Sequence, residues 1–119
     1  KSLKKEEKVR EYAYKTFEYD TPRAEACCRL GFSFLQEAKY VQAAYWYEAA
    51  VNVEKPKDSM GFFDEECWTW LPHLQLCVCY DKLGKYKLAY EHNEIARKFR
   101  PNDERILYNV NYFKNINIE

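Results

Sequence analysis

The sequence predicts an all-helical protein built from two stacked helical hairpins, with a further helix at each end. An internal repeat is the first reason: residues 30–34 align with residues 76–80 at an offset of 46. The correspondence continues at Tyr40/Tyr86, Ala43/Ala89 and Ala50/Ala96. Apolar residues within each unit also recur at steps of three and four, which is the spacing of one helix face. Finally, three glycines and no Asn-Gly or Asp-Gly pair are too few for a sandwich of tight β-hairpins.

Residues 1–20 are expected to form an N-terminal helix and a linker, because Val9, Tyr12, Ala13 and Phe17 recur at helical spacing. The helical-repeat domain then covers residues 21–119, and its first repeat spans 24–57. Thr21 and Pro22 suit the N-cap and the first helical position of that repeat. Its turn is expected at residues 37–39.

An insertion at 57–68 separates the repeats and predicts either longer helices or a loop that packs its aromatic side chains on the stack. The second repeat spans 70–103, since Pro72 has to lie in the first turn of a helix. Its turn is expected at residues 83–85. Asn102 is a good N-cap for a last helix at 103–114, which covers the open end of the stack.

Composition argues against several classes of function. The 19 basic and 19 acidic side chains cancel, whereas nucleic-acid and anionic-membrane binders carry a basic excess. Mean hydropathy is −0.72 and no apolar run approaches the roughly 18 residues of a membrane span. The chain begins with Lys1 and shows no signal-peptide pattern. We therefore expect no nucleic-acid partner and no membrane insertion.

Five cysteines, an odd count with two adjacent, predict buried reduced thiols rather than a disulfide framework, and hence a cytoplasmic location. Neither His73 nor His92 completes a zinc-binding spacing. No GxGxxG loop, P-loop or HExxH motif occurs, and the neighbouring acids Glu65 and Glu66 point apart on a helix. The expectation is therefore no catalytic residue, no metal and no cofactor in this chain. A thiol-based metal sensor is a separate hypothesis, which elemental analysis for zinc would test.

The repeated positions resemble those of the tetratricopeptide repeat, whose 34-residue pattern orders large, small and aromatic residues around a hairpin. The matching residues are Leu30, Gly31, Phe34, Tyr40, Ala43, Tyr47 and Ala50 in the first unit, and Leu76, Cys77, Tyr80, Gly84, Tyr86, Ala89, Ala96 and Pro101 in the second. Asn93, where an aromatic residue is usual, and the insertion of about a dozen residues depart from the pattern. The resemblance implies a short right-handed α-solenoid.

It also implies a concave groove lined by the first helix of each pair, which binds a protein or peptide. Transferring the family's groove positions to this chain gives Phe32, Leu35, Gln36, Leu71, Leu74, Val78, Asp81, Lys82, Arg105, Tyr108 and Tyr112, together with Glu25 and Cys28. Cys28 and Phe32 stand where the carboxylate-clamp branch has Lys and Asn, so a carboxylate clamp is not expected. An amphipathic helix, another part of the same polypeptide, or the chain's own N-terminal or inserted segment suits this groove instead.

Residues 21–24, 28–31, 61–63 and 90–94, and above all CWTWLPHLQLCVCYD at 67–81, resemble the C-terminal repeat region of bacterial family 2 glycosyltransferases. The similarity covers roughly residues 16–113. In that family a separate catalytic domain binds the nucleotide sugar and a metal through an Asp-x-Asp motif, which this chain lacks. The resemblance implies a non-catalytic companion of a nucleotide-sugar-dependent transferase.

Three functions follow as hypotheses. The chain is an interaction or scaffold module that docks a partner or its own catalytic domain, or an accessory module for the carbohydrate acceptor, or a free-standing peptide-binding adaptor. The acceptor hypothesis needs exposed rings at Phe62, Trp68 and Trp70, because flat aromatic rings stack on sugars. If these rings are buried, the hypothesis loses its motive.

Overall fold

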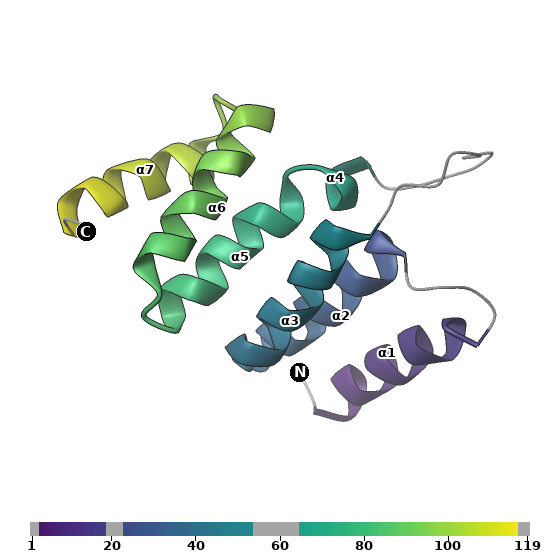
Figure 1. Cartoon of the computed structure of the whole chain (residues 1–119). Coiled ribbons are helices and arrows are strands. Elements are labelled where there is room, and N and C mark those ends of the chain that lie inside the picture. The colour runs from purple at the N-terminus through teal and green to yellow at the C-terminus, as the bar shows by residue number, and fades with distance from the viewer. Residues whose placement is uncertain (1–2, 19–22, 54–64, 117–119) are drawn as a thin grey trace.

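The computed structural model describes residues 3–18, 23–53 and 65–116, and within these ranges the chain is all-helical with no β-strand (Figure 1). Helix α1 is followed by two pairs of helices, with a short helix between the pairs, and by a last helix. Their bounds are α1 Leu3–Thr16, α2 Ala24–Gln36, α3 Tyr40–Asn52, α4 Glu65–Trp68, α5 Leu71–Lys82, α6 Tyr86–Phe99 and α7 Glu104–Ile116. The expected all-helical class is confirmed.

The helices pack mainly on their neighbours in the chain. α2 packs on α3 and α5 packs on α6, so each pair forms a helical hairpin, and α3 packs on α5 to join the two hairpins. α1 lies against α2 and α7 lies against α6, at the two ends of the row (Figure 1). The fold is a line of helices whose ends are covered by α1 and α7. Within the described ranges, none of these helices is long and apolar enough to cross a membrane.

The two hairpins turn in the same way, at the positions that the sequence predicts. The N–H of Lys39 donates to the carbonyl of Phe34 over 3.0 Å, and the N–H of Lys85 donates to that of Tyr80 over 2.8 Å. One residue earlier, Ala38 has φ 58° and Gly84 has φ 79°. A left-handed residue with these hydrogen bonds is the Schellman ending of a helix. All of these residues are related by the 46-residue offset.

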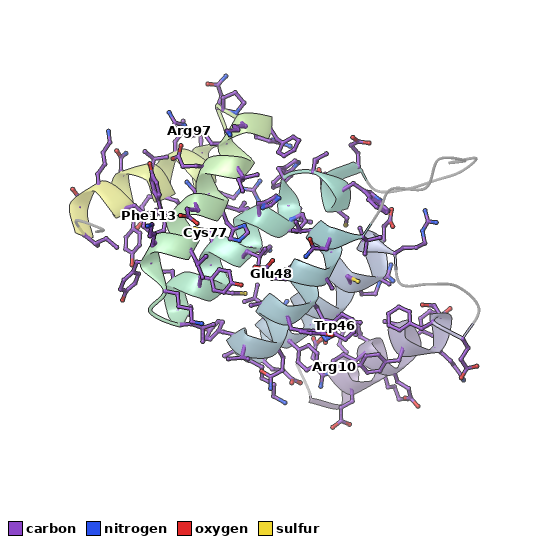
Figure 2. The ribbon with its side chains drawn as sticks, in the orientation of Figure 1. Arg10, Trp46, Glu48, Cys77, Arg97 and Phe113 are labelled. Carbon is purple, nitrogen blue, oxygen red and sulfur yellow. The ribbon has the colours of Figure 1, made fainter. Side chains whose placement is uncertain are left out.

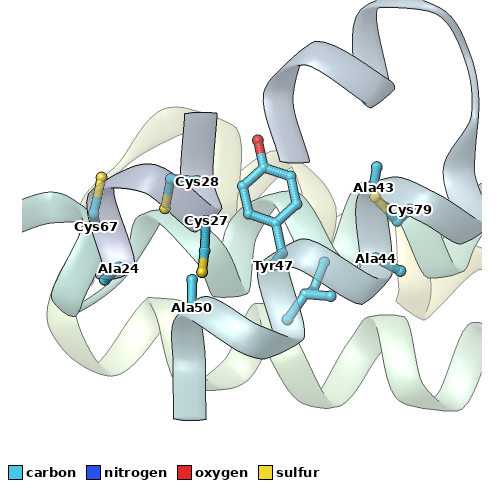
Figure 3. Packing of buried hydrophobic residues seen from close by; sticks show 10 residues of the cluster. Ala24, Cys27, Cys28, Ala43, Ala44, Tyr47, Ala50, Cys67 and Cys79 are labelled. Carbon is cyan, nitrogen blue, oxygen red and sulfur yellow. The ribbon is translucent and has the colours of Figure 1, made fainter. Parts of the chain in front are cut away.

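The first hairpin closes around a small-residue core (Figure 3). Gly31 of α2 faces the ring of Tyr47 of α3, which is 1% exposed. Around this contact lie small side chains that let the helices approach closely: Ala24, Cys27, Cys28, Ala43, Ala44, Ala50, Cys67 and Cys79. All five cysteines are buried thiols, as their odd number predicts. Burial raises the pKa of Cys27 to about 11 and that of Cys77 and Cys79 to about 12, which keeps these groups protonated.

Helix α1 is held by a polar contact and an aromatic one. The buried Ser33 donates to Glu6 over 2.6 Å and accepts a hydrogen bond of 3.1 Å from Arg10. At the end of α1, the rings of Tyr14 and of Phe17, the residue directly after the helix, lie 6.2 and 6.3 Å from that of Trp46 in α3. The predicted N-terminal helix therefore exists and is anchored to the first hairpin (Figure 2).

Two helix starts differ from the sequence prediction. α7 is capped by Asp103, whose Oδ1 accepts the N–H of Arg105 over 2.9 Å, rather than by Asn102. α2 begins at Ala24 with Arg23 at the N-cap and no side-chain hydrogen bond there. Thr21 and Pro22 lie outside the described residues. Pro72 does occupy the first turn of α5, as predicted.

Candidate binding pocket

A pocket of about 210 Å³ opens between α5 and α7, which both rest on α6. The described residues that line it all come from α5 and α7: Cys77, Val78, Asp81, Tyr108, Asn109, Tyr112 and Phe113. Figure 2 shows Cys77 and Phe113 close to each other where the last three helices meet. The pocket thus depends on α7 covering the end of the second hairpin.

A hydrogen bond links the two walls of the pocket. The hydroxyl of Tyr112 on α7 donates to Oδ1 of Asp81 on α5 over 2.6 Å. This hydrogen bond, together with burial and the charge of Asp81, raises the pKa of Tyr112 to about 12. The phenol therefore stays protonated at neutral pH and keeps donating to the carboxylate.

The inner end of the pocket is ordered by a chain of amides. Asn109 of α7 donates to Oδ1 of Asn93 over 3.0 Å and lies 3.8 Å from the sulfur of Cys77. Asn93, fully buried in α6, donates in turn to the carbonyl of Ile106 over 3.2 Å. Each amide thus has a partner, so the orientation of Asn109 in the pocket wall is fixed by α6.

Aromatic rings form the rest of the wall. Phe113 is 3% exposed and meets Tyr112 edge to face, with ring centroids 5.1 Å apart. Tyr90 of α6 supports Phe113 from behind in a second edge-to-face contact of 5.9 Å. Tyr108, in contrast, is 72% exposed. The pocket therefore has a rigid aromatic base and one exposed ring at its rim.

Four of the predicted groove residues come together here, namely Val78, Asp81, Tyr108 and Tyr112. Leu71 and Leu74 instead pack around Trp70 and Ile106. Phe32, Gln36 and Lys82 are exposed away from the pocket lining, and Leu35 packs on the core of the first hairpin. Arg105 lies over the ring of Trp70. Of the two remaining positions, Cys28 is buried and Glu25 accepts a hydrogen bond from Trp68.

Three lining residues were not predicted as site residues: Cys77, Asn109 and Phe113. Asn109 and Phe113 lie next to Tyr108 and Tyr112 and share their four-residue spacing. Residues four positions apart lie on the same face of a helix, so the pairs 108/112 and 109/113 together mark the side of α7 that faces the pocket. Cys77 gave no such signal, since its position in the repeat pattern explains it as a packing residue.

The tryptophans proposed for sugar stacking are engaged elsewhere. Trp70 is 7% exposed, and the guanidinium groups of Arg100 and Arg105 lie 4.6 and 5.1 Å from its ring centroid. The indole N–H of Trp68, which is half-buried, donates to Glu25 over 2.7 Å. Phe62 lies outside the described residues. Trp70 is therefore buried against two arginines and lacks the exposed ring that the acceptor hypothesis needs at this position.

A second polar cluster lies where α3, α5 and α6 meet. The Nδ1 atoms of His73 and His92 are 2.9 Å apart, Nε2 of His92 lies 3.5 Å from Glu48, and Tyr80 donates to Glu48 over 2.6 Å. Glu48 and His73 face opposite nitrogens of His92, so these groups do not converge on one point. Across the described ranges, no three His, Cys, Asp or Glu side chains are arranged to hold a metal ion. The cluster is a hydrogen-bond network between the two hairpins.

No family model, curated protein or solved structure matches this chain.

Proposed function

We propose that this chain is a helical-repeat interaction module that receives one side chain of a protein partner in the pocket between α5 and α7. The observation that carries the proposal is the pocket itself, which combines an exposed ring, a fixed amide and a carboxylate within about 210 Å³. Pockets for drug-sized small molecules span about 300–1,000 Å³. A space below that range suits a single side chain presented by a peptide.

The tetratricopeptide resemblance supports the same proposal. The two hairpins share their turn geometry at the 46-residue offset, and the packing of α3 on α5 is what stacking of such units requires. The pocket lies between α5, the first helix of the second hairpin, and α7, the helix that follows that hairpin. The tetratricopeptide resemblance predicts a groove between helices in these two positions. α1 packs on α2 and takes no part in lining this pocket, so it leaves the pocket open.

The partner in this proposal is a separate protein or the catalytic domain of a family 2 glycosyltransferase of which this chain is the C-terminal part. The resemblance of residues 67–81 supports that parentage. A cytoplasmic location is part of the proposal, since five buried thiols suit a reducing compartment. The burial of Trp70 favours a protein ligand over a carbohydrate acceptor. The reading frame upstream of Lys1 tests the parentage: an Asp-x-Asp domain there supports it, and a stop codon overturns it.

Selection of binding peptides from a random display library against the full chain tests the interaction itself. The informative pair of variants is Tyr108→Ser and Tyr12→Ser, because both tyrosines are 72% exposed and only Tyr108 lines the pocket. We expect Tyr108→Ser to weaken the selected peptides about tenfold or more, as loss of an aromatic anchor does. Tyr12→Ser is expected to leave their affinity unchanged. Equal affinities for both variants, or a selection that yields no peptide, would overturn the proposal.

A further inference from the structure

We infer that the side chain received by the pocket between α5 and α7 is basic, a lysine or an arginine. This inference rests on the proposed function of the same pocket and adds its specificity. It is carried by the charge in the pocket wall, by the aromatic rings beside that charge, and by the shape that a long side chain requires.

Of the described residues that line the pocket, Asp81 is the one that carries a charge. The hydroxyl of Tyr112 donates to its Oδ1, and Oδ2 keeps its own capacity to accept a hydrogen bond. An anionic ligand would be repelled by this carboxylate. A neutral aliphatic ligand would cover it without replacing its hydrogen bonds to water, which is unfavourable. A cationic N–H donor is attracted by the carboxylate and replaces the hydrogen bonds that it loses to water.

The aromatic rings favour the same ligand. Tyr108, Tyr112 and Phe113 line the same pocket as Asp81. The faces of aromatic rings carry partial negative charge and attract ammonium and guanidinium groups. Val78 and Cys77 offer apolar surface to the methylene stem that lysine and arginine place behind their charge. The lining therefore matches a long side chain with an apolar stem and a cationic end.

The chain's own cations near the pocket are engaged or directed elsewhere. Arg105, one turn before Asn109 on α7, donates to Asp103 over 2.8 and 3.1 Å. Lys82 follows Asp81 directly on α5, so it points about 100° away around the helix. Among the described residues no ion pair to the carboxylate of Asp81 is present, so it is available to a cation from a partner.

The test uses the full chain labelled with ¹⁵N and three small probes, the N-acetyl methylamides of lysine, arginine and norleucine. Norleucine keeps the length of the lysine stem without its charge. The side-chain amide of Asn109 lies in the pocket wall and reports on occupancy. We expect the lysine and arginine probes to shift its signals saturably, and norleucine to bind about tenfold more weakly. Equal binding of norleucine and the basic probes, or no shift with any probe, would overturn the inference.

Three variants separate the charge of Asp81 from its structural contact. Asp81→Asn keeps an oxygen that accepts the Tyr112 hydrogen bond and should reduce binding of the basic probes to the level of norleucine. Tyr112→Phe removes that hydrogen bond but keeps the charge, and should retain the basic preference. If Asp81 acted only through its contact with Tyr112, Asp81→Asn would retain binding and Tyr112→Phe would lose it, which would contradict the inference. Glu91→Gln, which removes an exposed acid of α6 outside the lining, is the matched control and should change nothing.

The peptides selected by display keep the two proposals distinguishable. If they bind through Tyr108 but show no enrichment of lysine or arginine, the basic specificity fails and the interaction module stands. If no peptide depends on Tyr108, the proposed function itself fails.

Discussion

Gly31 lies so close to the ring of Tyr47 that a methyl group at residue 31 would stand 2.8 Å from two of its ring carbons. The 46-residue offset places Cys77 and Asn93 at the corresponding positions of the second hairpin. The second hairpin therefore has the larger Cys77 in place of the glycine and the smaller Asn93 in place of the tyrosine. The contact also changes from an aromatic one to a polar one, because Asn93 donates to the carbonyl of Ile106 and accepts from the amide of Asn109.

Replacing Gly31 by alanine is expected to destabilise the protein. Tyr47 is 1% exposed and its ring lies within 2.9 Å of the added methyl, so the change overpacks the helix crossing at a cost of about 1–3 kcal/mol. Urea unfolding followed by circular dichroism measures the loss. The double variant Gly31→Ala/Tyr47→Leu should lose less than the sum of its two single changes, since the shorter side chain makes room for the methyl group. Simple additivity would show that the contact does not set the helix spacing.

The hairpins and their turns could be predicted because local chemistry determines them. Pro72 marks the first turn of one helix, and the 46-residue repeat shows that the second hairpin has the pattern of the first. Asn102 and Asp103 are both of residue types that cap helices, and the hydrogen bond that the N–H of Arg105 donates to Asp103 shows which of them caps α7. The pocket lining could not be predicted in full, since which residues of α7 meet α5 depends on how α7 packs on α6.

A glycine at residue 38 is expected to stabilise the first hairpin. Ala38 has φ 58°, a left-handed conformation that disfavours a side chain by roughly 1–2 kcal/mol, while glycine adds back some entropy to the unfolded chain. The net gain for Ala38→Gly should be about 0.5–1 kcal/mol. Thermal and urea unfolding measure it.

The control is the reciprocal change Gly84→Ala in the second hairpin. Gly84 has φ 79° and no atom within 4 Å of an added methyl, so its effect comes from the backbone alone. This variant should be destabilised. A neutral result at both positions would mean that the turns adjust their backbone without cost.

The contact between His73 and His92 predicts a loss of stability in mild acid. Burial, with a smaller contribution from the neighbouring His92, lowers the pKa of His73 from 6.5 to about 4, and burial also lowers the pKa of His92 despite the nearby Glu48 and Glu91. Between pH 6.5 and 4 the unfolded chain therefore binds protons that the folded chain does not. The stability contributed by the neutral pair is complete above pH 6.5 and declines as the pH falls toward 4.

The decline attributable to His73 should be on the order of 1 kcal/mol, because the ring is half-buried and solvent screens part of the effect. Carboxylates also titrate in this range, so the measurement is a difference: urea unfolding of the unmodified chain and of His73→Asn at pH 7 and pH 5. We expect the gap between the two proteins to narrow at pH 5. A gap that stays constant or widens would contradict the assignment.

The pocket depends on how firmly α7 is held at its start, and Asp103 is the residue that holds it. Its carboxylate accepts the backbone N–H and two side-chain N–H groups of Arg105, and these bonds lower the pKa of Asp103 to about 2. Arg105 in turn lies over Trp70, next to Arg100, so one carboxylate joins the helix cap to the aromatic contact beneath it.

Asp103→Ala should therefore cost about 1 kcal/mol, the usual value of an N-cap, and Asn102→Ala should cost little because Asn102 is exposed and is not the cap. Since α7 supplies four of the seven residues that line the pocket, loosening its start should also weaken the display-selected peptides. Urea unfolding and peptide affinity, measured on both variants, report the two effects. If Asp103→Ala lowers stability but leaves peptide affinity at the level of Asn102→Ala, α7 is held in place by its Phe113 end rather than by its cap.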